Sequence, residues 1–459
     1  MNSTRRDFLR IAGGAAAAAA LGRPGRAEAP AAAPAAGSAP AAGSAPAGRR
    51  PNIVFILADD YGIGGIGCYG AAYKTPVQDA LAREGLRFEQ CYSAPLCGPS
   101  RAMLMTGRYA FRTGVVDNGT GGAASPKREV PIARILKQAG YATGFAGKWH
   151  QLEYLNTAEE GREWGFDEFL RWNRARGERY WQPAYELNGK PVDAQDKYGP
   201  DLCHEFAADF ISRHKEGPFF LYYPMVLVHG PILRTPDGAE GGGRQDLFAD
   251  NVAYMDKLIG KLVAELDRLK LRENTAIVFT GDNGNVGGGT VNGRKIEGGK
   301  GSMKEGGSRV PLIVNWKGTT PAGQTSKDLI DFSDFYATFA ELAGAKPPEG
   351  VTLDSRSFAP QVLGRPGKPR EWLYVQLGSA RYVRDARYKL YGDGAMADLA
   401  EAPFQEKPVA ADAGGAEAAE ARKRLQAVLD GLEASGGEGA APAEPGPPGK
   451  AARAKRKKA

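Results

Sequence analysis

The 459-residue sequence predicts an α/β fold, in which buried strands alternate with amphipathic helices. Residues 52–58 and 275–280 are continuous apolar runs with β-branched residues, as in strands that are covered on both faces. Residues 130–139 and 245–271 place apolar side chains at helical spacing. Hydrophobic residues make up 42% and charged residues 25% of the chain, which is ordinary for a soluble globular protein. The length allows one large domain and a small one.

Further segments fit the same alternation of strands and helices. The stretch from 75 to 88 predicts a capped helix that leads into a short strand. Towards the C-terminus, alternating apolar residues predict antiparallel strands of a small appended sheet, covered by a helix. The other predicted strands are residues 141–146, 218–223, 312–316, 372–377 and 381–390, and the other predicted helices are residues 201–214, 331–343 and 416–432.

The two ends of the chain are predicted to lie outside the folded body. Residues 1–29 contain Arg5-Arg6 before Phe-Leu and a short Ala-rich run, which resembles a twin-arginine export signal. The run is too short for a transmembrane helix and no longer apolar stretch follows, so no stable membrane span is expected. Residues 30–49 are predicted to be a disordered Ala/Pro/Gly/Ser linker, and residues 436–459 a disordered basic tail. We expect the twin-arginine translocase to export the protein to the periplasm or the medium.

The net charge of +7 comes mostly from six Lys and Arg residues between 450 and 458. The folded body is therefore not basic, and no nucleic-acid partner is expected. Four cysteines are few for an exported protein of this size, so no disulfide framework is implied. Besides Cys97, they are Cys68, Cys91 and Cys203, whose pairing stays open.

Carboxylates follow two of the predicted buried strands. Asp59 and Asp60 come directly after residues 52–58, where adjacent charges repel unless a cation lies between them. Asp282 and Asn283 follow residues 275–280 in the same way. Open α/β sheets bind ligands at the carboxyl ends of their strands, and oxygen donors suit Ca²⁺ or Mg²⁺. For the Asp pair alone, a solvated turn is the alternative.

Cys97 lies at the start of a predicted helix, in the segment Leu96-Cys97-Gly98-Pro99-Ser100-Arg101. The unpaired N–H groups of a helix start favour a thiolate or a bound anion. A buried or capping cysteine is the alternative reading.

Cationic and imidazole side chains follow other predicted strands. Lys148 and His150 fall on one side of an extended chain because they are two residues apart. His229 comes after residues 218–223, and Lys300 lies in a glycine-rich segment. The chain has four histidines, two of which are at these positions.

The segments above resemble the type I sulfatases in at least five motifs, in the right order, between residues 51 and 390. In that family, Cys-x-Pro-Ser-Arg followed by Leu-x-Thr-Gly-Arg directs oxidation of the cysteine to formylglycine. Gly-Lys-Trp-His, Asp-Asn-Gly and Gly-Lys-Gly-x-x-x-Glu-Gly-Gly-x-Arg-Val-Pro also match. The resemblance implies the fold of the alkaline phosphatase superfamily, with a large mixed β-sheet sandwiched between helices and a small C-terminal antiparallel sheet with a helix. The catalytic domain would span residues 50–365, and the C-terminal subdomain residues 366–435.

The resemblance also implies a mechanism of sulfate ester hydrolysis. Hydrated formylglycine at position 97 would attack sulfur beside a divalent metal, expected to be Ca²⁺, although the ligands alone also permit Mg²⁺. A formylglycine-generating or anaerobic sulfatase-maturating enzyme would modify the cysteine. The implied metal ligands are Asp59, Asp60, Cys97, Asp282 and Asn283, and the implied catalytic residues are Cys97, Arg101, Lys148, His150, His229 and Lys300.

The nature of the substrate stays open at this point. Residues 163–198 are rich in Trp, Tyr and Arg and are expected to form loops at a cleft, where rings stack on a sugar or aryl group and arginines hold further anions. Ordinary loop packing is the alternative. The expected substrate is a sulfated small molecule or glycan. A phosphonate or phosphate ester hydrolase, or a non-catalytic glycan-binding relative with unmodified Cys97, are the other functions considered.

Overall fold

The computed structural model of the protein describes residues 50–149, 155–238, 240–241, 243–410 and 414–436. The chain divides into a unit Met1–Ala41, which lies outside the described residues, and a unit Ala42–Ala459, which contains all of them. The predicted export signal, the linker and nearly all of the basic tail also lie outside the described residues. No helix of the described part is long and apolar enough to cross a membrane.

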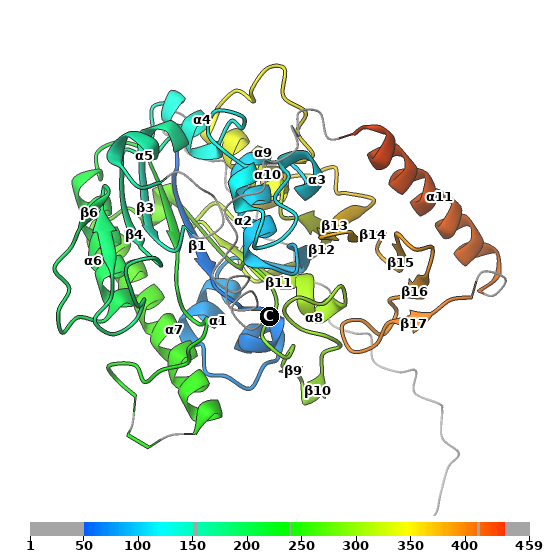
Figure 1. The fold of residues 1–459 in the computed structure, drawn as a ribbon, viewed down its shortest axis with the longest axis horizontal. Coiled ribbons are helices and arrows are strands. Elements are labelled where there is room, and N and C mark those ends of the chain that lie inside the picture. Colours follow the sequence, from blue (N-terminus) through cyan, green and yellow to red (C-terminus); the bar gives the residue numbers. More distant parts are fainter. Residues whose placement is uncertain (1–49, 150–154, 239, 242, 411–413, 437–459) are drawn as a thin grey trace, which may run out of the picture. The chain divides into compact units, whose positions relative to one another are not determined.

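A mixed ten-stranded sheet forms the centre of the large domain (Figure 1). Its order is β12-β2-β11-β8-β1-β7-β3-β4-β5-β6. β1 pairs in parallel with β7 and β8, whereas β11 pairs antiparallel with both β8 and β2. The predicted mixed sheet is therefore confirmed. The strands are β1 (Asn52–Ala58), β2 (Leu86–Tyr92), β3 (Ala142–Gly147), β4 (Glu168–Trp172), β5 (Tyr185–Leu187), β6 (Lys190–Pro191), β7 (Phe219–Pro224), β8 (Thr275–Gly281), β11 (Arg309–Asn315) and β12 (Gln324–Asp331).

Helices cover both faces of this sheet, as the alternation of side chains along β1 shows. Phe55 and its neighbours two residues away pack into one core with α2, α4 and α9, and the intervening residues pack into a second core with α1, α6 and α7 (Figure 1). β1 is fully buried for this reason. The helices of this domain are α1 (Pro76–Arg83), α2 (Cys97–Thr106), α3 (Ala110–Thr113), α4 (Ile132–Gln138), α5 (Ala158–Trp164), α6 (Gly199–Arg213), α7 (Arg244–Arg268), α8 (Glu305–Ser308), α9 (Asp334–Ala343) and α10 (Ala359–Val362).

A five-stranded antiparallel sheet follows in the C-terminal part, as predicted. Helix α11 (Gly415–Ala434) packs against β14 and β15 and covers it. The stretch 381–390 forms two strands, because a turn at residues 385–387 separates them. The strands are β13 (Leu373–Leu377), β14 (Ala380–Arg384), β15 (Tyr388–Tyr391), β16 (Met396–Asp398) and β17 (Lys407–Pro408), and a separate ribbon is formed by β9 (Thr290–Val291) and β10 (Arg294–Lys295).

Two regions differ from the expectation. The edge strand β12 was not expected, because its exposed half carries polar residues without an apolar run. Residues 163–198 are not loops throughout, since β4, β5 and β6 extend the large sheet. Trp164, Tyr180 and Tyr185 are buried in the two cores and are not available for stacking on a ligand.

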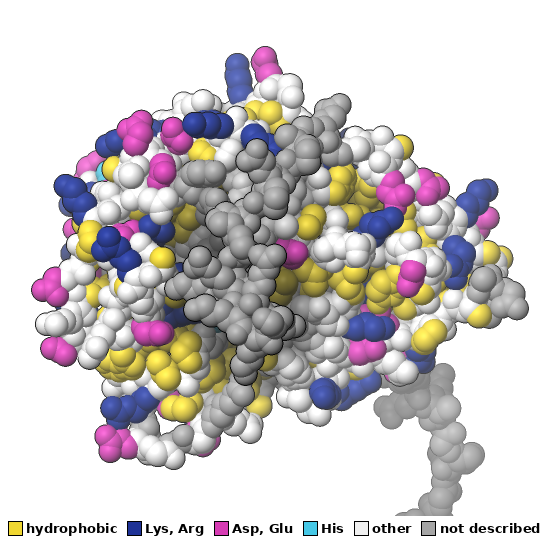
Figure 2. All heavy atoms as spheres, viewed as in Figure 1, with side chains coloured by type: hydrophobic (Ala, Val, Ile, Leu, Met, Phe, Trp, Pro, Cys, Tyr) yellow, Lys and Arg dark blue, Asp and Glu magenta, His cyan; other side chains and the backbone are white. Residues whose placement is uncertain are grey.

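Acidic and basic side chains are interspersed on the described surface that Figure 2 shows. This distribution agrees with the expectation that the folded body is not basic.

Candidate active site

The carboxyl ends of β1 and β8 bring the predicted metal ligands together. Because Ala58 pairs with Gly281, the residues that follow lie side by side. The Asp60 backbone N–H donates to Asp282 Oδ1 at 3.0 Å. Asp60 has φ 60°, a left-handed conformation that Asp and Asn tolerate better than most residues.

These residues fit a hard divalent cation. Asn283 Nδ2 donates to Asp60 Oδ1 at 2.9 Å, while Asn283 Oδ1 is buried and has no hydrogen-bond partner in the described part of the chain. Such an orphaned oxygen beside carboxylates is a ready cation ligand. Ligand atoms of Asp59, Asp60, Cys97 and His229 also lie within 4.8 Å of one another. His229 was not among the predicted metal ligands.

Cys97 is the first residue of α2 and faces the carboxylates. Its Sγ lies 3.4 Å from Asp59 Oδ1 and 3.9 Å from Asp60 Oδ1, and Lys148 Nζ donates to it at 3.4 Å. Burial raises the pKa of the Cys97 thiol well above its usual range, and the neighbouring Asp282 adds to this effect. In the unmodified residue, burial therefore opposes the thiolate that a helix start alone favours.

Cations surround the carboxylates at short range. Lys148 Nζ lies 2.6 Å from Asp59 Oδ2, and Lys300 Nζ lies 2.6 Å from Asp60 Oδ1. Although burial opposes ionisation, Lys148 and other positive neighbours lower the pKa of Asp59. His229 Nε2 lies 3.8 Å from Asp60 Oδ2, and burial lowers the pKa of this histidine.

Arg101, from the second turn of α2, holds two of these segments in place. Its Nε and Nη2 donate to Asp282 Oδ2 at 3.1 and 2.8 Å, and its Nη1 donates to the Lys148 carbonyl oxygen at 2.8 Å. The side chain is 2% exposed. The structure thus gathers every predicted site residue except His150, which lies outside the described residues.

The loop that carries Lys300 is pressed against the end of β8. The Lys300 N–H donates to the Asn285 carbonyl oxygen, and a Cβ on Gly284 would lie 1.7 Å from the Gly306 carbonyl oxygen. Only glycine allows this approach. Lys304, four residues further on, points away from the site towards Glu406.

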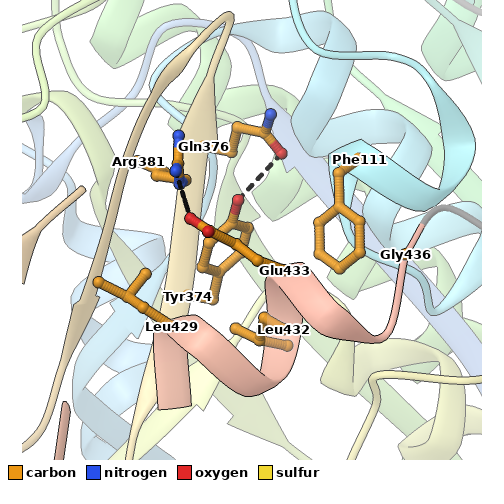
Figure 3. A pocket seen from close by; sticks show the side chains of 8 residues that line it. All are labelled: Phe111, Tyr374, Gln376, Arg381, Leu429, Leu432, Glu433 and Gly436. Carbon is orange, nitrogen blue, oxygen red and sulfur yellow. Dashed lines mark hydrogen bonds and ion pairs between the residues drawn. The ribbon is translucent and has the colours of Figure 1, made fainter. Parts of the chain in front are cut away.

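Two cavities open on this cluster, and at least two more lie elsewhere in the described chain. One, of about 440 Å³, is lined by Lys148 and His229, and another, of about 540 Å³, reaches Asp60. One of the latter, of about 260 Å³, lies between α3, β13, β14 and α11, where Arg381 pairs with Glu433 (Figure 3). Its mostly apolar lining shares no residue with the cluster, so it is not a candidate for the chemistry.

The comparison with known protein families decides what this arrangement is. Residues 51–345 match the model of the family described as Sulfatase. The chain belongs to the sulfatase family. It is therefore a sulfuric ester hydrolase of the alkaline phosphatase superfamily, as the motifs predicted.

Curated relatives and solved structures agree with this assignment. The chain is 35% identical to human arylsulfatase A over 391 residues, which cover 75% of each protein. It is 32% identical to N-acetylgalactosamine-6-sulfatase of Canis lupus familiaris, with 74% of this chain and 71% of the relative covered. The crystal structure of Ps i-CgsB in complex with k-i-k-neocarrahexaose has 27% identity and a TM-score of 0.71, over 84% of this chain and 93% of that one.

Two residues beside the cluster in this sulfatase were not predicted from the sequence as site residues. Arg179 and Trp172 line the 440 Å³ cavity, and the Arg179 guanidinium carbon lies 4.1 Å from the Trp172 ring centroid. The richness of residues 163–198 in Arg and Trp was a signal for the region. It could not distinguish these two residues from neighbours that are buried or exposed.

Proposed function

We propose that the protein hydrolyses sulfate esters of saccharides or aryl compounds through a formylglycine made from Cys97, and releases inorganic sulfate. The observation that carries the proposal is the position of Cys97 Sγ, 3.4 Å from both Asp59 Oδ1 and Lys148 Nζ. Its raised thiol pKa makes the unmodified side chain a poor nucleophile at this place. An aldehyde hydrate supplies a hydroxyl nucleophile there, and its second hydroxyl allows the sulfated enzyme to break down.

The metal is proposed to be Ca²⁺, with Mg²⁺ as the other ion that the ligands permit. Asp59, Asp60, Asp282, Asn283 and the modified residue 97 would hold it. The unpartnered Asn283 Oδ1 supports this set. When bound, the ion supplies positive charge that lowers the barrier for a nucleophile approaching an anionic ester.

The chain's own cations bind and orient the sulfate group. Lys148, His229 and Lys300 approach the carboxylates from three separate segments, Lys148 at Asp59 and the other two at Asp60. Lys300 or His229 is proposed to protonate the leaving oxygen. His150 is proposed to take the proton from the remaining hydroxyl. Arg101 is proposed to hold the segments that carry Asp282 and Lys148 in position through its hydrogen bonds to both.

Export and maturation are also proposed from the sequence. Residues 1–29 would direct the chain to the twin-arginine translocase, and a maturating enzyme would convert Cys97 before export to the periplasm or the medium. The domain limits 50–365 and 366–435 belong to the same proposal, which is supported by the start of the small sheet at Leu373.

The test combines mass spectrometry with matched esters. In protein from its own host, the tryptic peptide that contains Cys97 should carry the aldehyde instead of the thiol. Such protein should release sulfate from 4-nitrophenyl sulfate much faster than phosphate from 4-nitrophenyl phosphate, and Cys97→Ala should release neither.

Faster phosphate release would favour the phosphatase alternative. An unaltered thiol at position 97 would contradict the formylglycine mechanism and favour the non-catalytic one.

A further inference from the structure

The 440 Å³ cavity beside the active site is lined by two arginines in addition to Lys148 and His229. Lys148 and His229 form the part next to the carboxylates, and Arg174 and Arg179 line the remainder. Among its described lining residues there is no carboxylate. Because like charges in a confined space repel one another, an anion bound between them is favourable.

Arg179 is held in a fixed position, and some of its hydrogen-bond donors are not used by any described residue. Its side chain is 11% exposed and stacks on Trp172, while its Nε and Nη1 are buried and have no hydrogen-bond partner among the described residues. Among the described residues, the carboxylate that approaches it is that of Asp59, whose Oδ2 lies 4.0 Å from Nη1. That oxygen already pairs with Lys148 Nζ at 2.6 Å. Buried donors without partners are costly, so this guanidinium is suited to receive a ligand.

The neighbouring cavity has the opposite character. Tyr73, Ile232, Phe248 and the 66% exposed Val286 line it, and Asp60 is its charged group. An anionic substituent would be repelled by that carboxylate and would lose its hydration against apolar side chains. A second negative group on a substrate is therefore favoured only on the Arg179 side.

We propose that the cavity binds a second anionic group of the same substrate molecule, so that the enzyme prefers sulfate esters that also carry another sulfate or a carboxylate. Arg179 donates to this group, and Arg174 at the open side adds positive charge. Arginine suits the role because its planar head presents several donors to oxyanions. The inference rests on the proposed function, because it concerns the substrate of that same site.

The experiment measures kcat/KM for 4-nitrophenyl sulfate, for its ring-carboxylated analogues and for 4-nitrocatechol disulfate. The readout is the ratio of each substituted ester to the unsubstituted one, compared between wild type and variant, so that intrinsic reactivity cancels. Arg179→Gln should lower the ratio at least about tenfold, and Arg179→Lys should lower it less. Arg176→Gln is the matched control, because Arg176 is 58% exposed, pairs with Glu186 and lies outside the cavity lining. Its ratio should change less than about twofold.

The outcomes separate the inference from the proposed function. A ratio that stays constant in both Arg179 variants overturns the inference, even if kcat/KM falls for every ester, since Arg179 would then hold the scissile sulfate or support the fold. If wild-type protein with converted Cys97 releases sulfate from none of the esters, the proposed function fails instead. A ratio that falls only for the disulfate, or only for the carboxylates, supports the inference and identifies the second group.

Discussion

Two clusters of buried charge in this molecule differ in the polar atoms that lie beside them. The active-site cluster consists of Asp59, Asp60, Asp282, Arg101, Lys148 and Lys300. The subdomain cluster consists of Glu305, Glu406, Lys389, Arg384 and Tyr92, and it joins the large sheet to the small one. In the latter, Lys389 Nζ lies 3.2 Å from Glu305 and 2.6 Å from Glu406, and the Tyr92 hydroxyl donates to Glu305 at 2.6 Å.

The difference lies in the atoms that have no partner. None of the members of the subdomain cluster has a buried side-chain nitrogen or oxygen without a hydrogen bond. Beside the active-site cluster, Asn283 Oδ1 and two nitrogens of Arg179 have no partner within the described residues. Burial of charge by itself therefore does not mark a functional site in this sulfatase. Unpaired polar atoms do not mark it by themselves either, since Arg272 Nη1 and Gln361 Oε1 lack partners away from the site. Their position beside the carboxylates is what suits Asn283 and Arg179 to receive a ligand.

The largest expected effect comes from Asp60→Asn in the active-site cluster. Turnover of 4-nitrophenyl sulfate should fall on the order of 10³-fold, because the variant removes a proposed metal ligand and the Lys300 partner. The free energy of unfolding, measured in chelator, should change by no more than about 1 kcal/mol. Asn tolerates the left-handed backbone conformation at this position. The loss of the ion pair with Lys300 is offset because the repulsion among three neighbouring carboxylates is also relieved.

Conversion of Cys97 in the Asp60→Asn variant is checked by mass spectrometry, so that a failure of maturation is not mistaken for a failure of catalysis. Asp430→Asn, on α11, is the control that should keep its turnover. If Asp60→Asn retained more than about a tenth of wild-type turnover, the functional role of the active-site cluster would be contradicted.

The sequence could predict the part of this contrast that involves residues close together in the chain, but not the part that involves residues far apart. The ends of β1 and β8 were predictable, because apolar runs locate the strands and the acidic residues follow directly. The subdomain cluster was not, since Glu305 and Lys389 are 84 positions apart and meet only when the two sheets pack. The edge strand β12 was missed because half of it is polar. The unpaired donors of Arg179 also depend on side-chain packing, which no local pattern encodes.

A smaller effect, on stability alone, is expected from Lys389→Met in the subdomain cluster. The variant leaves Glu305 and Glu406 buried without their shared cation, which should cost about 3–5 kcal/mol of unfolding free energy in urea. Lys407→Met is the matched control from the same sheet. Its pair with Glu401 is about half exposed and should contribute at most about 1 kcal/mol. Equal losses in the two variants would show that the members of the subdomain cluster are not tightly coupled.

The smallest effect is the pH dependence of the subdomain cluster. Although burial opposes ionisation, Lys389, Arg384 and Arg309 lower the pKa of Glu305 to about 2. A carboxyl whose pKa is lower in the folded state stabilises the protein above its unfolded pKa, and this contribution is lost as pH falls towards the folded one. The stability difference between wild type and Glu305→Gln should therefore be largest near neutral pH, on the order of 3 kcal/mol, and should shrink between about pH 5 and 2.

Urea unfolding of both proteins from pH 7 to 3 measures this difference, and the other carboxyl groups cancel because both proteins carry them. A difference that grew on acidification would mean that burial outweighs the three cations and raises the pKa of Glu305 in the folded state. The buried charges of the subdomain cluster would then destabilise the folded protein, and only the packing around them would keep them in place. The contrast with the active-site cluster would have to rest on unpaired atoms alone.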